Sequence, residues 1–480
     1  MHTLLPPGAR DTIDLRASIG SLGAGLLSAG LSTGSKSFRM AILYPFRAWR
    51  YNPATVRLDD VVTQPYDKIS PAMQQAYYQS SPYNLVRIIL GLPELFDAER
   101  GESVYSRAAR DFRAWRDQGV LIQEKTPCVF AYAVRFKTPG SGEIKERRGF
   151  IALGKLHDYA DGVVFRHEQT LSKPKSDRLS LLKATRAHFG QIFMLYSDPS
   201  GSAERLLYDG SGTPDAEVTD EYGVQHRLWR ISDPATIRLL TTAMRDKKLI
   251  IADGHHRYET ALAYSKEHAA TLTPRAESHV NSLPQPPFPE AAVMMTFVNM
   301  DSDGLVVLPT HRVVYGLEGF DAAGFLAEAS EFFSAEKLPD AGAEGYLAAL
   351  RTDCETAFVA VLKDGAWLLR PKAETTTPML AHLAERQKKL DLTVLHNVLL
   401  EHVLGLTDEN IREQTNLRYL RDAADAVDQV RRGDANIAFL TNPVSMEQLK
   451  EVAFAGDVMP QKSTDFYPKL LSGLTVYALD

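Results

Sequence analysis

The stretch 248–258 constrains the fold more than any other part of this 480-residue chain. Residues 248–252 form a short, mostly apolar run, Asp253 and Gly254 form a turn dipeptide, and apolar residues recur at helical spacing from His255 onward. The pattern predicts a strand, a tight turn and a helix in direct succession. Helices and strands also alternate through the C-terminal part of the chain, so we expect an α/β fold of the mixed α+β kind.

The turn and the first helical residues, Asp253-Gly254-His255-His256-Arg257, have the composition of an anion site. The first turn of a helix offers free backbone N–H groups and the positive end of the helix dipole. Gly254 permits a phosphate to approach the backbone, Arg257 adds a forked donor, and the two imidazoles donate further hydrogen bonds. Asp253 is able to cap the helix or to bind a metal ion. The alternatives are a simple capping turn with exposed histidines, and a dinuclear metal site, which adjacent helical residues are badly placed to chelate.

A second polar segment, 167–178, is dense in reactive groups. Glu168, flanked by His167, is a candidate general base or Mg²⁺ ligand. Asp177 is a candidate to orient a cation or to bind metal. Three basic side chains of the segment could neutralise phosphates: Lys173, Lys175 and Arg178. The alternative is a solvated loop.

A third segment, 459–470, contains Lys462-Ser463-Thr464. These three residues match the end of a P-loop, but no glycine-rich stretch precedes them, so the P-loop interpretation fails. A lysine beside two hydroxyls is still able to bind a phosphate or a carboxylate. The alternative is a turn with surface lysines.

Composition narrows the class of protein. Lysine and arginine number 54 against 60 acidic residues, a net charge of −6, so a dedicated nucleic-acid binder is not expected. The two cysteines, Cys128 and Cys354, argue against a disulfide scaffold and a thiolate zinc site, and a cytoplasmic location is expected. No apolar run reaches 18 residues, so no membrane span is expected. The short apolar stretch 19–31 lacks a small-residue cleavage site and follows acidic residues, so it does not predict a secretion signal.

Proline-rich and glycine-rich stretches mark boundaries that divide the chain into four predicted parts. They are a disordered extension over 1–39, an N-terminal α/β segment over 40–127, a core over 128–272 and a C-terminal α/β domain over 290–480. A proline-rich linker is expected between the last two. Within these parts we expect a strand over 84–90, a hairpin over 129–153 and a long helix over 377–405.

Six blocks together resemble the domain-of-unknown-function family 1015. They are Pro45-Phe46-Arg47-Ala48, Gln64-Pro65-Tyr66-Asp67, the segment 167–178, the stretch 253–257, Leu308-Pro309-Thr310-His311-Arg312 and the segment 459–469. The resemblance covers roughly residues 40–480 in the same order. It implies a family, with little indication of function.

The stretch 253–257 also resembles the signature of the free-serine kinases, which share the fold of ParB and sulfiredoxin. In that superfamily the strand–turn–helix unit holds nucleotide phosphates, so the resemblance implies a ParB/sulfiredoxin-like core with flanking segments. The kinases have an upstream His-Glu-Gln segment whose glutamate is the catalytic base, and His167-Glu168-Gln169 matches it. Here 85 positions separate Glu168 from Asp253, so an insertion, near 198–224, must be assumed. The sulfiredoxin cysteine has no counterpart before His256.

The resulting hypothesis is a small-molecule kinase that uses ATP or ADP with Mg²⁺, its acceptor a hydroxyl compound such as free L-serine. The catalytic residues would be Glu168 and His167, with Asp253 or Asp177 as metal ligand. The expected cofactor-binding residues are Asp253, Gly254, His255, His256, Arg257, Lys173, Arg178, Lys462, Ser463 and Thr464. Two alternatives stay open: a phosphate-ester or nucleotide hydrolase with the same phosphate site, and a nucleotide-gated binding protein without catalysis. The expected partners are a nucleotide and a small substrate, with neither nucleic acid nor membrane.

Residues 1–39 show no apolar periodicity and few groups able to pack, so we predict that they are dispensable for folding. A chain that begins at Met40 should keep the melting temperature of the full chain in differential scanning calorimetry. A fall of many degrees would show that the extension packs on the body.

Overall fold

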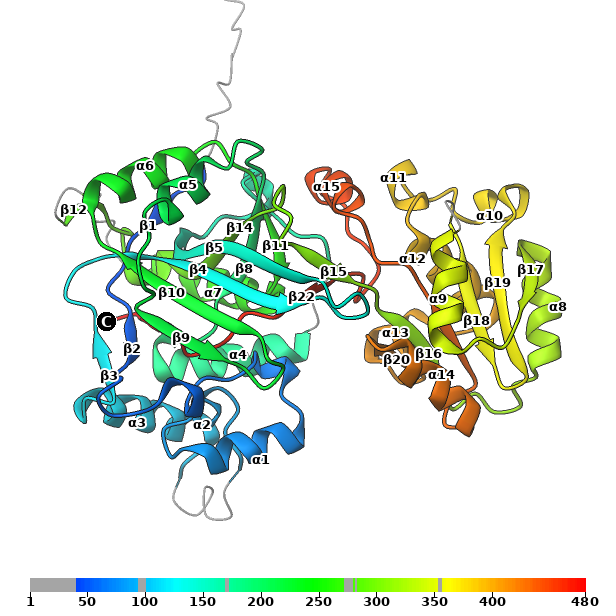
Figure 1. Ribbon diagram of the computed structural model, residues 1–480, viewed down its shortest axis with the longest axis horizontal. Coiled ribbons are helices and arrows are strands. Elements are labelled where there is room, and N and C mark those ends of the chain that lie inside the picture. Colours follow the sequence, from blue (N-terminus) through cyan, green and yellow to red (C-terminus); the bar gives the residue numbers. More distant parts are fainter. Residues whose placement is uncertain (1–39, 94–100, 169–171, 272–278, 281–282, 353–355) are drawn as a thin grey trace, which may run out of the picture. The chain divides into compact units, whose positions relative to one another are not determined.

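The computed structural model describes residues 40–93, 101–168, 172–271, 279–280, 283–352 and 356–480. The expectation for residues 1–39 and part of the expected linker after residue 272 lie outside these ranges. The fold of the described chain is mixed α/β (Figure 1).

The larger sheet contains the strand of the 248–258 stretch. Among the described residues its strands run in the order β6 (Val164–Phe165), β11 (Leu249–Asp253), β8 (Ile192–Tyr196), β14 (Ala292–Asn299), β5 (Ile144–Lys155), β4 (Val129–Lys137), β10 (Gln225–Ile231) and β9 (Ala216–Thr219), with β1 (Leu43–Tyr44) beside β5. The pairs β6–β11 and β8–β14 are parallel and the other pairs are antiparallel. The predicted hairpin over 129–153 is confirmed by the antiparallel pairing of β4 with β5.

Both faces of the central strands are buried. Every residue of β8 and of β14 is buried. Ile250 and Ile251 of β11 enter different apolar clusters, because successive side chains of a strand point to opposite faces. Ile251 shares its cluster with Tyr258 and Ala261 of the following helix, so helix and strand are held together by the packing of that helix's apolar side.

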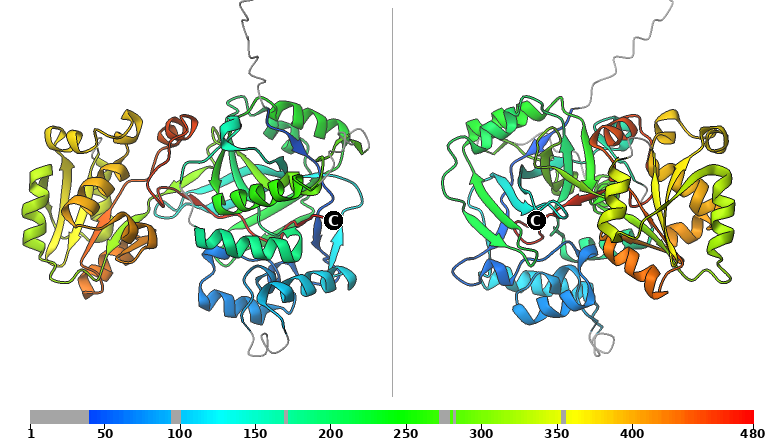
Figure 2. Two further views of the ribbon diagram at one scale, coloured as in Figure 1. Left: turned by 180° about the vertical axis from the view of Figure 1, so that it is seen from behind. Right: turned by 45° about the vertical axis from the view of Figure 1, so that its right-hand side comes forward.

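Seven helices belong to the described chain before residue 272. They are α1 (Pro71–Ser80), α2 (Val86–Ile89), α3 (Val104–Asp117), α4 (Ser172–Thr185), α5 (Ser202–Tyr208), α6 (Pro234–Met244) and α7 (His255–Ala269). Helix α4 packs between α3 and α7, and α5 packs on α6; Figure 2 shows these helices from behind. None of the described helices has the length and apolar character needed to span a membrane.

A second sheet follows, with the strand order β17 (Phe333–Leu338), β19 (Gly365–Pro371), β18 (Phe358–Leu362), β21 (Ile437–Leu440), β16 (His311–Val314) and β20 (Leu417–Leu420). Its helices are α8 (Ala322–Phe332), α9 (Gly342–Thr352), α10 (Ala373–Met379), α11 (Glu385–Lys388), α12 (Asp391–Val394), the π-helix η5 (Leu395–Val403), α13 (Asp408–Glu413), α14 (Ala423–Arg432) and α15 (Met446–Phe454).

The last 22 residues, 459–480, form a C-terminal tail that returns from the second sheet to the first part of the chain. Strand β22 (Asp465–Tyr467) pairs with β15 (Val306–Leu308), and β23 (Tyr477–Ala478) pairs with β7 (Ala187–His188). Between them Ser472 bridges to Thr63, and Val476 bridges to Trp49 in β2 (Trp49–Tyr51), which pairs with β3 (Leu121–Gln123). The segment 290–480 therefore contributes to both parts, since β14 lies in the larger sheet and the C-terminal tail bridges to Thr63 and Trp49.

Two expected elements are wrong. Within residues 84–90 the chain forms the helical turn α2 (Val86–Ile89) instead, and the Asn84 side chain accepts the Val86 N–H at 2.9 Å just before it. The expected helix over 377–405 is divided into α10, α11, α12 and η5. Pro378 lies in the last turn of α10, and a proline disrupts the helix that precedes it.

The tail prediction concerns Leu479, which is 1% exposed although it is the second residue from the end. Leu479→Ala should cost about 2–5 kcal/mol of unfolding free energy because it leaves a cavity in a packed region. The matched control is Leu239→Ala on α6, where the leucine is 57% exposed and a change within about 0.5 kcal/mol is expected. Urea denaturation measures both, and equal effects would show that the tail is not packed.

Candidate functional site

Helix α7 begins immediately after the turn predicted from the sequence. Gly254 has φ +92° and ψ +26°, a left-handed conformation that favours glycine. A Cβ at this position would also lie 3.0 Å from the Arg257 guanidinium, which folds back over the turn. No side chain of the described residues caps the first-turn N–H groups of α7. The strand–turn–helix prediction is thus confirmed, and the helix end is available to an anion.

A series of ion pairs with alternating charges lies beside the first turn of α7. Arg257 donates to Asp253 at 2.6 Å, Asp253 pairs with Lys469 at 3.3 Å, Lys469 pairs with Asp465 at 3.0 Å, and Arg421 donates to Asp465 at 2.6 Å. Burial opposes charge on both carboxyls, but the neighbouring cations outweigh it. They hold the pKa of Asp253 well below its ordinary value and lower the pKa of Asp465 to about 2. These ion pairs connect the start of α7, the tail and the end of β20.

Glu168 is held by the tail turn at 462–464. Lys462 has φ +57°, and this left-handed residue turns the Ser463 and Thr464 N–H groups toward Oε1 of Glu168, at 3.1 and 3.4 Å. The Ser463 hydroxyl donates to the Pro460 carbonyl at 2.5 Å. The predicted carboxylate-binding capacity of Lys462-Ser463-Thr464 is therefore used on a carboxylate of the same chain. The second carboxylate oxygen of Glu168 has no partner among the described residues.

Arg312 fixes this tail turn from the second sheet. Its side chain is fully buried, and Nη2 donates to the carbonyls of Gln461 and Lys462, each at 3.3 Å. Its Nε lies 3.3 Å from Nε2 of His396 on the π-helix. Burial lowers the pKa of His396 well below its ordinary value, so this imidazole is a neutral acceptor.

His167 lies behind Glu168 and does not line the cavities described below. It is fully buried, its Nε2 is 2.7 Å from the Thr464 hydroxyl, and its ring is 4.8 Å from that of His255. Burial lowers the pKa of both imidazoles. Nε2 of His255 is buried and finds no hydrogen-bond partner within the described part of the chain.

Two cavities meet at Glu168. The helix-end cavity, of about 70 Å³, is lined by Tyr66, Asp67, Glu168, Asp253, Gly254, His255, His256, Arg257 and Lys462. The larger tail pocket, of about 440 Å³, shares Asp67, Glu168, Asp253, His255 and Lys462 with it. The remaining walls of the tail pocket come mostly from the tail and from the second sheet, including Tyr419, Arg421, Asp465 and Lys469.

Lysines as well as carboxylates line these two cavities. Lys68 and Lys462 have no ion-pair partner among the residues that the structure describes. Burial and the neighbouring Lys469 lower the pKa of Lys68, and burial and Lys462 lower that of His256. A group of cations that depress one another's protonation favours an anionic ligand.

Several predicted residues lie elsewhere. Asp177 lines neither cavity: it accepts from the Tyr105 hydroxyl at 2.7 Å and from Arg178 Nε at 2.8 Å. Arg178 also donates to the Ile89 carbonyl and lies over the Tyr66 ring. The side chain of Lys173 falls outside the described part, and Lys175 pairs with Glu259. The two predicted metal ligands are not brought together, and the described residues contain no cluster of three acidic, histidine or cysteine side chains suited to a metal.

Sequence reasoning missed six residues of the site: Asp67, Lys68, Arg312, Arg421, Asp465 and Lys469. Asp465 and Lys469 are four positions apart within a segment already recognised as unusual, so their spacing was a usable signal. Arg312 and Arg421 reach the site through the second sheet and the return of the tail, which no local pattern reveals.

Solved structures with some likeness to the chain include three proteins. A conserved hypothetical protein from Pyrococcus furiosus has 13% identity and a TM-score of 0.32, over 65% of this chain and 91% of its own. Free serine kinase in complex with AMP has 15% identity and a TM-score of 0.31, over 65% and 89%. SbnI with C-terminal truncation from Staphylococcus aureus has 10% identity and a TM-score of 0.30, over 67% and 85%. At these identities and TM-scores the likeness does not indicate a function for this chain.

The family comparison is stronger. No curated protein matches the sequence. Residues 43–393, more than half of the chain, match the family model described as a protein of unknown function, DUF1015. The tail turn and the residues Arg421, Asp465 and Lys469 lie beyond the matched range. The chain belongs to the DUF1015 family.

Proposed function

We propose that this protein is a small-molecule kinase that transfers the terminal phosphate of ATP or ADP to a hydroxyl compound. The observation that supports this best is the shared cavity: Glu168 and the N-terminus of α7 line the same space although 85 positions separate Glu168 from Asp253. A carboxylate beside a phosphate-binding helix end is the arrangement that phosphoryl transfer to a hydroxyl requires.

The donor phosphates would bind in the helix-end cavity. The uncapped N–H groups of α7 and Lys462 supply hydrogen bonds and positive charge there. The unpartnered Nε2 of His255 would gain a partner when a phosphate oxygen arrives. Arg257 acts indirectly, because its guanidinium is already bound to Asp253 and to the Gln191 carbonyl.

Glu168 would act as the general base toward the tail pocket. Oε1 is fixed by the tail turn, so the free oxygen has a defined direction. It would take the proton of the acceptor hydroxyl while the acceptor oxygen bonds to the terminal phosphorus. The bond from that phosphorus to the bridging oxygen breaks, and ADP or AMP leaves. The tail pocket has room for a small acceptor, and free L-serine is the one that the motif resemblance implies.

Mg²⁺ would enter with the nucleotide and neutralise phosphate charge. Asp253 is a poor ligand because each of its oxygens already pairs with a cation. Asp67 lines both cavities and has no ion-pair partner among the described residues, so it is the better placed carboxylate.

The base assignment predicts the behaviour of Glu168→Gln. Glutamine keeps an oxygen for the Ser463 and Thr464 N–H groups but is not basic, so nucleotide affinity should stay within about threefold while the transfer rate falls by about 10²–10⁴-fold. Calorimetry with ADP and chromatographic detection of the product nucleotide, with L-serine and a metabolite extract as acceptors, measure the two quantities.

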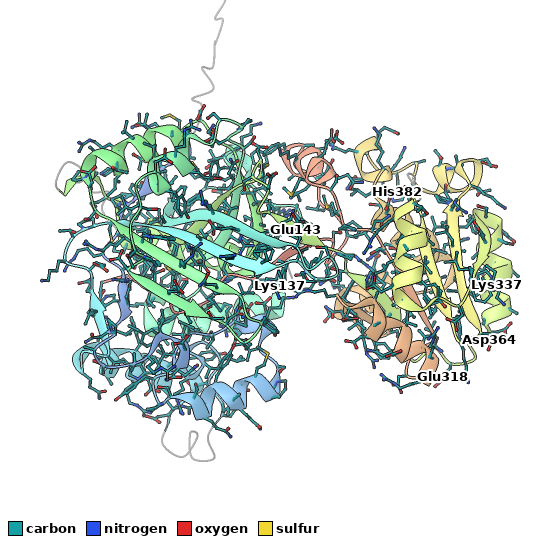
Figure 3. The ribbon with its side chains drawn as sticks, in the orientation of Figure 1. Lys137, Glu143, Glu318, Lys337, Asp364 and His382 are labelled. Carbon is teal, nitrogen blue, oxygen red and sulfur yellow. The ribbon has the colours of Figure 1, made fainter. Side chains whose placement is uncertain are left out.

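The matched control is Glu318→Gln, an exposed glutamate near the second sheet (Figure 3), which should change neither quantity. Full transfer by Glu168→Gln would contradict the base assignment. Release of inorganic phosphate without any acceptor product would indicate the hydrolase alternative. Nucleotide binding without turnover in the wild type would indicate the binding-protein alternative.

The phosphate site predicts the behaviour of Lys462→Gln. Loss of one charge-assisted contact costs about 1.5–3 kcal/mol, so the Kd for ADP should rise by about ten- to a hundredfold. The control Lys337→Gln alters an exposed lysine of the second sheet (Figure 3) and should leave the Kd unchanged. Equal affinities of the two variants in calorimetry would exclude Lys462 from the phosphate site.

A further inference from the structure

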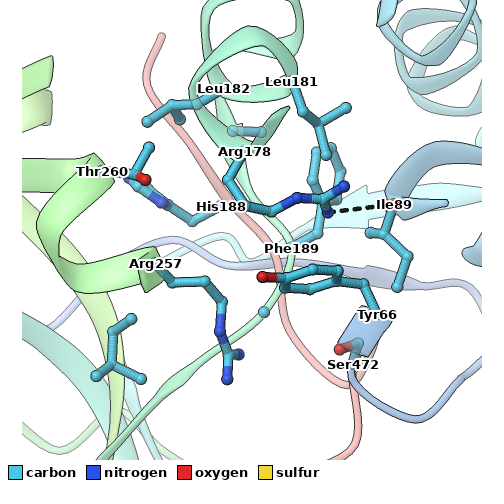
Figure 4. A pocket seen from close by; sticks show the side chains of 13 residues that line it. Tyr66, Ile89, Arg178, Leu181, Leu182, His188, Phe189, Arg257, Thr260 and Ser472 are labelled. Atoms are coloured by element: carbon cyan, nitrogen blue, oxygen red, sulfur yellow. Dashed lines mark hydrogen bonds between the residues drawn. The ribbon is translucent and has the colours of Figure 1, made fainter. Parts of the chain in front are cut away.

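A third cavity adjoins the helix-end cavity. This apolar slot, of about 60 Å³, is lined by Tyr66, Ile89, Arg178, Leu181, Leu182, Ala187, His188, Phe189, Gly190, Ile192, Arg257, Thr260 and Ser472. Figure 4 shows it between Thr260 and Arg257 of α7, the leucines of α4, and the segment of Tyr66. Tyr66 and Arg257 line both the slot and the helix-end cavity, so the two spaces are neighbours.

The walls of the slot are held in place without a ligand. Arg178 lies 4.0 Å from the centroid of the Tyr66 ring and is anchored by Asp177 and, at 2.8 Å, by the Ile89 carbonyl. Arg257 is anchored by the Gln191 carbonyl and by Asp253. A narrow slot with fixed aromatic and aliphatic walls suits a flat ring system.

Thr260 and His188 bring further polar groups to this space, beside the two arginines, Tyr66 and Ser472. Thr260 is 5% exposed, and its hydroxyl has no hydrogen-bond partner among the described residues. A buried hydroxyl without a partner is unfavourable, so it marks a place where a ligand is able to supply one. His188 also lines the slot, and burial lowers its pKa to about 4, so its neutral ring offers one donor and one acceptor.

We propose that the slot binds the planar base of the nucleotide, with the Thr260 hydroxyl and the His188 ring on the polar edge of that base. The inference rests on the proposed function, which sets the phosphates at the first turn of α7. Thr260 is five residues beyond His255, about 7–8 Å along the helix axis. One sugar unit spans a separation of this order, so a single nucleotide reaches from the helix-end cavity into the slot.

The test compares ADP with pyrophosphate by titration calorimetry of the full chain in the presence of Mg²⁺. Pyrophosphate carries the phosphates without the base. Stacking and burial of the base should make ADP bind at least about tenfold more tightly than pyrophosphate. This comparison uses the wild-type protein and does not depend on how any variant folds.

Thr260→Val then tests the hydroxyl, because valine has nearly the same shape and no polar atom. ADP affinity should fall by about three- to tenfold and pyrophosphate affinity should not change. The control Thr242→Val alters an exposed threonine of α6 and should change neither.

The outcomes separate the two proposals. If ADP and pyrophosphate bind equally well, or if Thr260→Val leaves their ratio unchanged, the base lies elsewhere and the inference is overturned while the phosphate site stands. If neither ADP nor pyrophosphate binds, both the base-binding inference and the proposed function are wrong.

Discussion

The alternating charge chain from Arg257 through Asp253, Lys469 and Asp465 to Arg421 is the interaction on which the site depends. Its members come from helix α7, the tail and the end of β20, and Lys469 and Asp465 are about nine-tenths buried. Removing one partner of a buried ion pair leaves an uncompensated charge, at a cost of about 3–5 kcal/mol. These ion pairs therefore connect the tail to the start of α7.

The return of the tail to the larger sheet also positions the Glu168 side chain. Pairing of Met459 with the His167 carbonyl lays the tail beside the 167–168 segment, and Arg312 sets the tail turn whose N–H groups hold the carboxylate. Glu168, with one fixed oxygen, and the start of α7 then line the same cavity. In the proposed kinase this arrangement would hold the base close to the phosphates and to the acceptor hydroxyl.

Sequence patterns correctly predicted the elements whose structure depends on residues close together in the sequence. The strand, turn and helix over 248–258 follow from periodicity and from the left-handed preference of Gly254, and the hairpin of β4 with β5 follows from a turn between two strands. Residues 84–90 were expected to form a strand because buried branched residues suit either structure, but residues 86–89 form the helical turn α2. The partners of Glu168 lie almost 300 positions away in the tail. Asp177, expected to orient a cation or to bind metal, accepts from Tyr105 and Arg178 outside the two cavities. Such pairings depend on the topology, and no sequence period encodes them.

The most direct test of the central claim is a crystal structure of the protein with ADP and Mg²⁺. The account predicts phosphate oxygens within hydrogen-bond distance of the first-turn N–H groups of α7 and of Lys462. It also predicts that Glu168 remains on the tail turn, with its free oxygen facing the tail pocket. Phosphates bound away from the α7 N-terminus, or a Glu168 carboxylate that has left the tail turn, would contradict it.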